Sequence, residues 1–135
     1  MHEGHQGIVP IAPAVEQIGR RTLNAAFAVH RALGPGLLES VYEACLAQEL
    51  GKTGLGCQRQ VGVPVTYDEV RVDVGYRIDL LVEGSVVVEV KSIDALASIH
   101  TAQILTYLRF SGARLGYLIN FNSLLLKNGI RRVVL

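Results

Sequence analysis

The sequence predicts an α/β domain in which helices flank a mixed central sheet. Two long segments near the N-terminus have apolar residues at helical spacing, and three apolar runs with short turns between them follow. A third helical segment and one or two further strands complete the chain. At 135 residues, half of them apolar, the chain can form one domain with a hydrophobic core. Residues 1–13 contain glycine and proline without periodicity, which predicts a flexible N-terminal tail before a single domain of residues 14–135.

The first two elements are predicted to be helices. Residues 14–33 place an apolar stripe on one side, and Gly34-Pro35-Gly36 then ends the helix. Residues 37–50 form the second helix, which Gly51 terminates. Four of its residues are predicted to face the core: Leu38, Val41, Cys45 and Leu46.

The middle of the chain is predicted to be an antiparallel meander of three strands. These strands are residues 58–67, 71–82 and 86–91, and Pro64 predicts an edge position or a bulge in the first. Residues 98–111 form an amphipathic helix, followed by strands at 115–121 and 130–135. Because that helix is a crossover connection, the strand after it is expected to run parallel to one of the earlier strands.

The composition limits which cellular compartment and which binding partners can be expected. The formal net charge is +1, so any contact with nucleic acid must use a local patch rather than a field over the whole molecule. The two cysteines are not in a C-x-x-C pair, which fits a reducing, cytoplasmic compartment. No apolar run approaches about 18 residues, so no membrane helix is expected. The high apolar fraction favours a homodimer.

The strongest functional signal lies in the hairpin of residues 77–91. A three-residue turn at 83–85 places Asp79 opposite Glu89, and strand alternation puts both acids on one face with Lys91. The other face is predicted to be wholly apolar: Ile78, Leu80, Val82, Val86, Val88 and Val90. Two carboxylates in a buried sheet are unfavourable unless a cation meets them. That cation is Lys91, Arg77 or a divalent metal ion.

An acid followed by Glu-x-Lys on paired strands matches the needs of metal-dependent phosphodiester hydrolysis. Mg²⁺ prefers oxygen ligands and retains waters, so two carboxylates and a substrate phosphate are enough to hold it. Lys91 would then stabilise negative charge on the phosphate. The alternative interpretation is a hairpin whose acids and lysine form an ordinary salt bridge.

Several motifs recur along residues 29–135. The first is Gly36-Leu37-Leu38-Glu39-Ser40-Val41-Tyr42, and the others are G-Y-R-I-D-L-L-V, V-V-E-V-K-S, I-H-T-A-Q-I-L-T-Y-L and G-Y-L-I-N-F-N-S-L-L-L-K-N-G-I. With these motifs in this order, residues 29–135 resemble the GxxExxY proteins, a family in the PD-(D/E)XK nuclease superfamily. The resemblance implies a restriction-endonuclease-like core of order α-β-β-β-α-β. At the position of the superfamily's Pro-Asp pair, this chain has Ile78-Asp79. The proline is replaced, and the acid is retained as Asp79.

The resemblance also implies roles for single residues. Asp79 and Glu89 would bind Mg²⁺ or Mn²⁺, and Lys91 would be the catalytic lysine. Glu39 would be a further acid that binds metal directly or through water, although an acid in a first helical turn is also explained by the helix dipole.

Residues on the helix at 98–111 complete the implied site. Gln103 and Tyr107 match a Q-x-x-x-Y signature whose residues contact substrate or orient the site. His100 lies one turn earlier on the same stripe and could join these two residues in the site. The alternative interpretation is that His100 is a half-buried histidine that hydrogen-bonds to the backbone. His30 and Tyr42 are interpreted as packing and supporting residues.

Two functions follow from these patterns. The first is a metal-dependent nuclease that hydrolyses phosphodiester bonds in DNA. The second is a catalytically silent module on the same fold that binds nucleic acid or protein. Its candidate patches are the arginines Arg20, Arg21, Arg31, Arg131 and Arg132.

Overall fold

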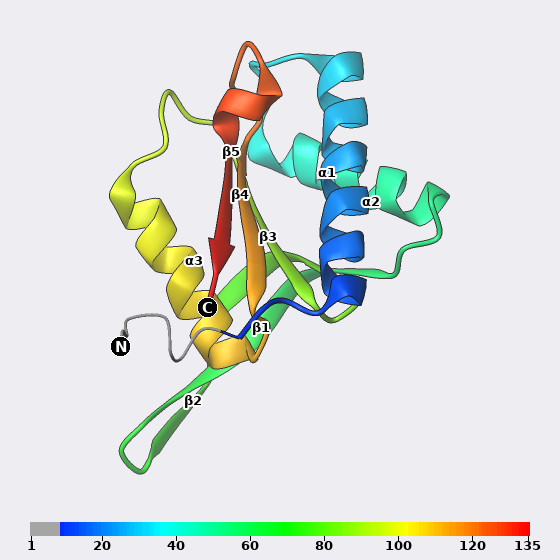
Figure 1. Cartoon of the computed structure of the whole chain (residues 1–135). Coiled ribbons are helices and arrows are strands. Elements are labelled where there is room, and N and C mark those ends of the chain that lie inside the picture. The colour runs from blue at the N-terminus through cyan, green and yellow to red at the C-terminus, as the bar shows by residue number, and fades with distance from the viewer. Residues whose placement is uncertain (1–8) are drawn as a thin grey trace, which may run out of the picture.

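The computed structural model describes residues 9–135 and confirms the predicted α/β class and element order (Figure 1). The elements are α1 (Pro13–Leu33), α2 (Glu39–Lys52), β1 (Cys57–Tyr67), β2 (Val70–Val82), β3 (Val86–Lys91), α3 (Ser98–Ser111), β4 (Leu115–Asn120), the 3₁₀ helix η2 (Leu126–Gly129) and β5 (Ile130–Val134). The second helix begins at Glu39 rather than at the predicted Leu37.

The five strands form one mixed sheet in the order β1-β2-β3-β4-β5. β3 pairs with β4 in parallel, and the other neighbours are antiparallel. Helix α3 is the crossover between the two parallel strands, as predicted from the position of that helix in the chain. Figure 1 shows α1 and α2 on one side of the sheet and α3 on the other.

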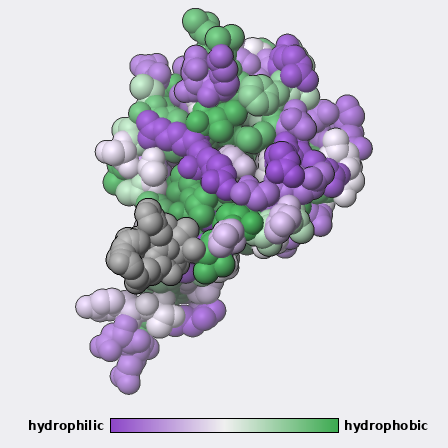
Figure 2. All heavy atoms as spheres, viewed as in Figure 1, coloured by the Kyte–Doolittle hydropathy of each residue, from purple (hydrophilic) through white to green (hydrophobic). Residues whose placement is uncertain are grey.

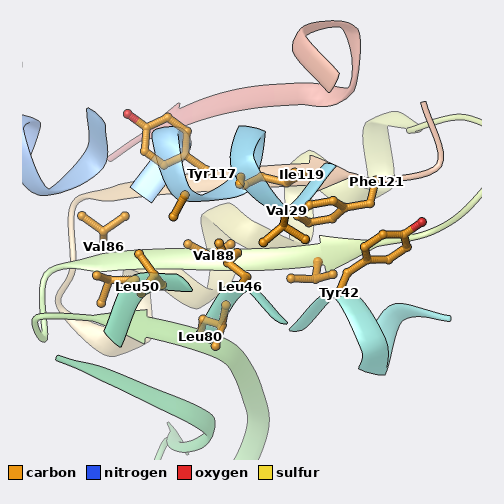
Figure 3. Packing of buried hydrophobic residues seen from close by; sticks show 14 of the residues in the cluster. Val29, Tyr42, Leu46, Leu50, Leu80, Val86, Val88, Tyr117, Ile119 and Phe121 are labelled. Carbon is orange, nitrogen blue, oxygen red and sulfur yellow. The ribbon is translucent and has the colours of Figure 1, made fainter. Parts of the chain in front are cut away.

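The larger hydrophobic core lies between the sheet and helices α1 and α2 (Figure 3). In this core the ring of Tyr42 stacks on Phe121, with 4.6 Å between ring centroids and 10° between planes. The predicted inward face of α2 was wrong for two residues: Leu38 is 73% exposed and Val41 is 37% exposed. The buried residues are instead Tyr42, Glu43, Leu46 and Leu50. The stacking of Tyr42 on Phe121, the residue after β4, therefore determines which side of α2 faces the core. The charged residue Glu43 lies on this buried side of the helix.

A second, smaller core lies between the sheet and α3. It contains Ile78, which the strand alternation had placed on the opposite face with Leu80. This prediction was wrong because β2 does not alternate regularly through Asp79. The strand pairs with β3 only from Leu80 to Val82, and before that point it follows β1 alone.

The outer halves of β1 and β2 form a hairpin that projects from the body of the domain (Figure 1). The pairing register shifts between Val63 and Val65, around Pro64. β1 is also one of the two edge strands of the sheet, so both the edge position and the bulge expected from Pro64 are confirmed. In Figure 2 the end of this hairpin is hydrophilic, and the rest of the visible face mixes apolar and polar patches.

The chain enters the domain just before α1. Most of the predicted flexible tail, residues 1–8 of 1–13, lies outside the described residues. The carbonyls of Val9 and Pro10 accept hydrogen bonds from Arg114, and α1 already begins at Pro13. None of the helices within residues 9–135 has the length and apolar character needed to cross a bilayer.

Candidate active site

Asp79 and Glu89 meet where the β2–β3 ladder opens. The ladder pairs Leu80 with Val88, and at the next position side chains replace the backbone pairing. The amide of Asp79 donates to Oε1 of Glu89 at 3.1 Å, and the amide of Val90 donates to Oδ2 of Asp79 at 2.9 Å. Each carboxylate therefore binds the backbone of the opposite strand, and the two acids lie side by side as the hairpin register predicts.

The environment of this pair disfavours negative charge. Burial, followed by the charge of Asp79, raises the pKa of Glu89 to about 8. Burial is also the main reason that the pKa of Asp79 is raised, and the carboxylate of Glu43 adds to the shift. Without a cation, the pair therefore retains a proton near neutral pH.

Lys91 follows Glu89 by two positions on β3 and belongs to the same site. Burial raises the pKa values of both acids, while the positive charge of Lys91 acts on both in the opposite direction. The backbone of Lys91 is fixed because its carbonyl accepts the amide of Phe121 at 2.9 Å. The structure thus brings the acid, acid and lysine of the predicted motif together where the pairing of β2 with β3 ends.

Glu43 is a third acid at this site, and it is not part of the motifs from which the site was predicted. Its side chain is buried, and Arg59 Nε donates to its Oε2 at 3.1 Å. The amide nitrogen of Gln60 donates both to Oε1 of Glu43 at 2.7 Å and to Oδ1 of Asp79 at 3.3 Å. A signal for Glu43 exists in the sequence, since it lies three residues before Leu46 and shares that residue's inner helical face.

Glu39 lies at the start of α2 and is exposed. Its Oε2 accepts the amide of Ser92 at 3.2 Å, and the hydroxyl of Ser92 donates to the carbonyl of Leu37 at 2.6 Å. Within residues 9–135, no three His, Cys, Asp or Glu side chains are grouped so that they could hold one metal ion. The role of Glu39 as a metal ligand stays a prediction, and its observed contact fastens α2 to the residue after Lys91.

Tyr42 fastens the same loop from inside the core. Its hydroxyl donates to the carbonyl of Gly34 at 2.5 Å and accepts the amide of Leu37 at 3.1 Å. Gly36 between them has a left-handed backbone, with φ of 102°, which favours glycine. The G-x-x-E-x-x-Y segment is therefore a clasp that joins the α1–α2 loop to the end of β3. His30 supports the neighbouring loop through its Nε2, which lies 2.7 Å from the carbonyl oxygen of Ser123.

Helix α3 places Tyr107 beside the acids. Burial, followed by the charges of Glu89 and Asp79, raises the pKa of Tyr107, whose ring stacks on Tyr76 with 4.4 Å between centroids. Gln103 is exposed one turn earlier on the helix. The side chain of His100 is half-buried, and its Nδ1 accepts the amide of Ala97 at 2.9 Å, which is the backbone-bonded alternative for this residue.

Several arginines of the candidate binding patches form hydrogen bonds or ion pairs within the domain. Arg131 donates to the carbonyls of Leu96 and Ala97. Arg132 forms an ion pair with Glu16, and Arg21 donates to the carbonyl of Thr53. These guanidinium groups therefore make contacts that hold segments of the fold together.

Comparison with known proteins identifies the family. Neither the curated proteins nor the solved structures include a significant match to this chain. Residues 16–133 match the family model described as the PD-(D/E)XK nuclease superfamily. The matched range contains α2, α3 and strands β1 to β4 in full, α1 from Glu16 onward, β5 up to Val133, and the paired acids with Lys91. The chain belongs to the PD-(D/E)XK nuclease superfamily.

Proposed function

We propose that this protein is a metal-dependent nuclease that hydrolyses phosphodiester bonds in DNA with Mg²⁺ or Mn²⁺. The observation that carries the proposal is the pairing of Asp79 with the buried Glu89, beside Lys91, where β2 separates from β3. Like charges held this close are unfavourable, and burial adds to the penalty. A divalent cation would offset both effects.

The donor set fits a hard divalent ion. Asp79 and Glu89 offer carboxylate oxygens, and each has one oxygen that does not accept a backbone amide of the opposite strand. Two carboxylates leave coordination positions for waters and a substrate phosphate, which is the arrangement that Mg²⁺ accepts. When bound, the ion would polarise a phosphoryl oxygen and lower the pKa of a coordinated water.

The other residues have roles that follow from their positions. The ammonium group of Lys91 stabilises the negative charge that develops on the phosphate. Tyr107 and Gln103, which lie on α3, contact the DNA strand that is cleaved. Glu39 holds Ser92, and through it the end of the strand that carries Lys91.

DNA as the substrate is supported by the superfamily and by the motifs of the chain. The clasp formed by Gly36, Glu39 and Tyr42 corresponds to the GxxExxY signature. The Gln103 and Tyr107 pair matches a Q-x-x-x-Y signature, which favours ends or single strands as the preferred DNA.

A direct assay tests the proposal. Purified protein is incubated with linear, nicked, flapped and single-stranded DNA in the presence of Mg²⁺ or Mn²⁺, and Asp79→Asn serves as the inactive variant. Cleavage by the wild type alone supports the proposal. Confirmed metal binding without cleavage of any of these substrates would contradict it.

The second candidate is a catalytically silent binding module. It is favoured by the net charge of +1 and by arginines that are bonded within the domain, because a nuclease needs a surface that attracts phosphates. Calorimetric titration with Mn²⁺ separates the two candidates. A silent module has no use for a metal ion and would show no binding heat.

A further inference from the structure

Gln60 has an unusual backbone for a residue inside a strand. Its φ is 52°, in the left-handed region that is unfavourable for residues with a side chain. Asp68 and Glu83, the other non-glycine residues with positive φ in the range 9–135, lie at hairpin turns where such angles are common. No turn explains the strain at Gln60, and strain of this kind is often maintained at functional sites.

The irregularity coincides with the candidate active site. The β1–β2 ladder pairs Arg59 with Leu80 and Val61 with Ile78, and Gln60 is left out between them. The residue that faces this gap on β2 is Asp79. Both strands thus depart from regular pairing at the same place, which turns the side chain of Gln60 towards the acids.

The side-chain amide of Gln60 links two carboxylates from different elements. Its nitrogen donates to Oε1 of Glu43, on α2, at 2.7 Å and to Oδ1 of Asp79, on β2, at 3.3 Å. The second oxygen of Asp79 is held by the amide of Val90, so both of its oxygens have fixed partners. Arg59 holds the second oxygen of Glu43. One pair of adjacent residues on β1 therefore orients the acid on the helix and one acid of the sheet.

We propose that Gln60 is a positioning residue that orients Asp79 for a divalent cation, an inference that rests on the proposed function. A neutral amide suits this place because it donates to both acids without adding a third negative charge or a positive charge that would compete with the cation. With the left-handed backbone at Gln60, the amide reaches both Glu43 and Asp79. Partners that orient metal ligands in this way usually change metal affinity about 10- to 100-fold when they are removed.

The test uses Gln60→Gly, with Gln58→Gly as its matched control. Glycine removes the amide and relieves the left-handed backbone, so the midpoint of thermal unfolding is expected to stay the same or rise. Gln60 is exposed, so water replaces the lost side chain. The affinity for Mn²⁺, measured by calorimetry, is expected to fall about 10- to 100-fold. The paramagnetic resonance spectrum of the bound Mn²⁺ is expected to change because Asp79 loses a fixed orientation.

Gln58 is the same residue type, exposed on the same strand and regularly paired with Leu81. Its replacement by glycine is expected to leave the Mn²⁺ affinity and spectrum unchanged, and not to raise the unfolding midpoint. This pair of variants separates an effect on the metal site from an effect on the strand.

The measured Mn²⁺ affinities distinguish the role proposed for Gln60 from the proposed nuclease function. Wild-type Mn²⁺ affinity in Gln60→Gly would overturn the role of Gln60 and leave the proposed nuclease in place. A parallel loss of thermal stability and affinity in that variant would show a merely structural residue and would also overturn it. A wild-type protein that binds no Mn²⁺ would overturn both proposals together.

Discussion

The amide of Asp79 donates to the carboxylate of Glu89, and the carboxylate of Asp79 accepts an amide from the strand that carries Glu89. The two side chains thus take the place of one rung of backbone pairing between β2 and β3. This exchange holds two carboxyl groups together, and that of Glu89 is buried. The penalty for ionising them is a property of the fold itself, and it makes the site sensitive to pH and to cations.

Stability should depend on the protonation of Glu89. Its pKa is raised from 4.5 to about 8 in the folded protein, so the folded state binds more protons than the unfolded state between these values. The free energy of unfolding is therefore expected to fall as the pH rises from about 4.5 to about 8, by on the order of a few kcal/mol. Urea unfolding in the presence of a chelator measures this change. In Glu89→Gln the decrease should be much smaller, and parallel curves for the two proteins would refute the assignment.

Binding of Mn²⁺ should release protons. The ion binds carboxylates in their ionised form, whereas burial and the charge of Asp79 keep Glu89 largely protonated below about pH 8. The affinity is expected to rise with pH until about 8 and then to level off. Calorimetry at pH 7 in two buffers of different ionisation enthalpy reports the proton release. Equal binding heats in both buffers would show that no proton leaves the site.

Substitutions of Lys91 and Asp79 should have different effects on catalysis and on metal binding. Lys91→Met removes a charge that stabilises the reacting phosphate, so kcat is expected to fall about 10²- to 10³-fold. The same change removes a positive charge beside the cation, so Mn²⁺ should bind as tightly as before or more tightly. Asp79→Asn should lose both binding and cleavage, and Lys127→Met on η2 is the control for charge. Loss of Mn²⁺ binding in Lys91→Met would contradict this division of roles.

Glu43 and Glu39 should differ in their effect on the acids. Burial is the main cause of the raised pKa of Asp79, and the charge of Glu43 raises it further. Glu43→Gln is therefore expected to shift the pH dependence of Mn²⁺ binding to lower pH, by less than about one pH unit. Glu39→Gln changes a residue that binds the amide of Ser92 instead, and its pH dependence should match the wild type. An equal shift in both variants would indicate that Glu39 also lies within reach of the acids.

Tyr42→Phe should weaken the clasp between the α1–α2 loop and the core. The variant keeps the stacking on Phe121 but removes the hydroxyl that binds Gly34 and Leu37. Because Tyr42 is fully buried, the loss is expected to be about 1–3 kcal/mol of unfolding free energy. Tyr67→Phe, at a side chain that is 81% exposed, should have no measurable effect. A Tyr42→Phe protein as stable as the wild type would show that the clasp adds nothing to stability.

Much of the fold followed from local patterns. The alternation of β3, the turn at 83–85 and the crossover helix at 98–111 were enough to predict the mixed sheet and to bring Asp79 next to Glu89. These features depend on short-range rules of strand pairing and helix spacing, which the amino-acid order carries directly.

The remaining features depend on tertiary contacts. The side of α2 that is buried is set by the stacking of Tyr42 on Phe121, which is far away in sequence. The irregular backbone at Gln60 and the displaced alternation at Ile78 arise where β2 leaves β3 and follows β1 alone. No propensity of single residues marks these places, so the participation of Gln60 in the site became visible only in three dimensions.

The proposed chemistry requires Asp79 and Glu89 to hold one divalent cation. A crystal of the wild-type protein soaked in Mn²⁺ at about pH 8, with anomalous diffraction recorded for manganese, shows whether they do. We expect one anomalous peak bonded to a carboxylate oxygen of each acid, and no peak at this position in Asp79→Asn. A wild-type crystal with no manganese between these two carboxylates would contradict the proposed chemistry.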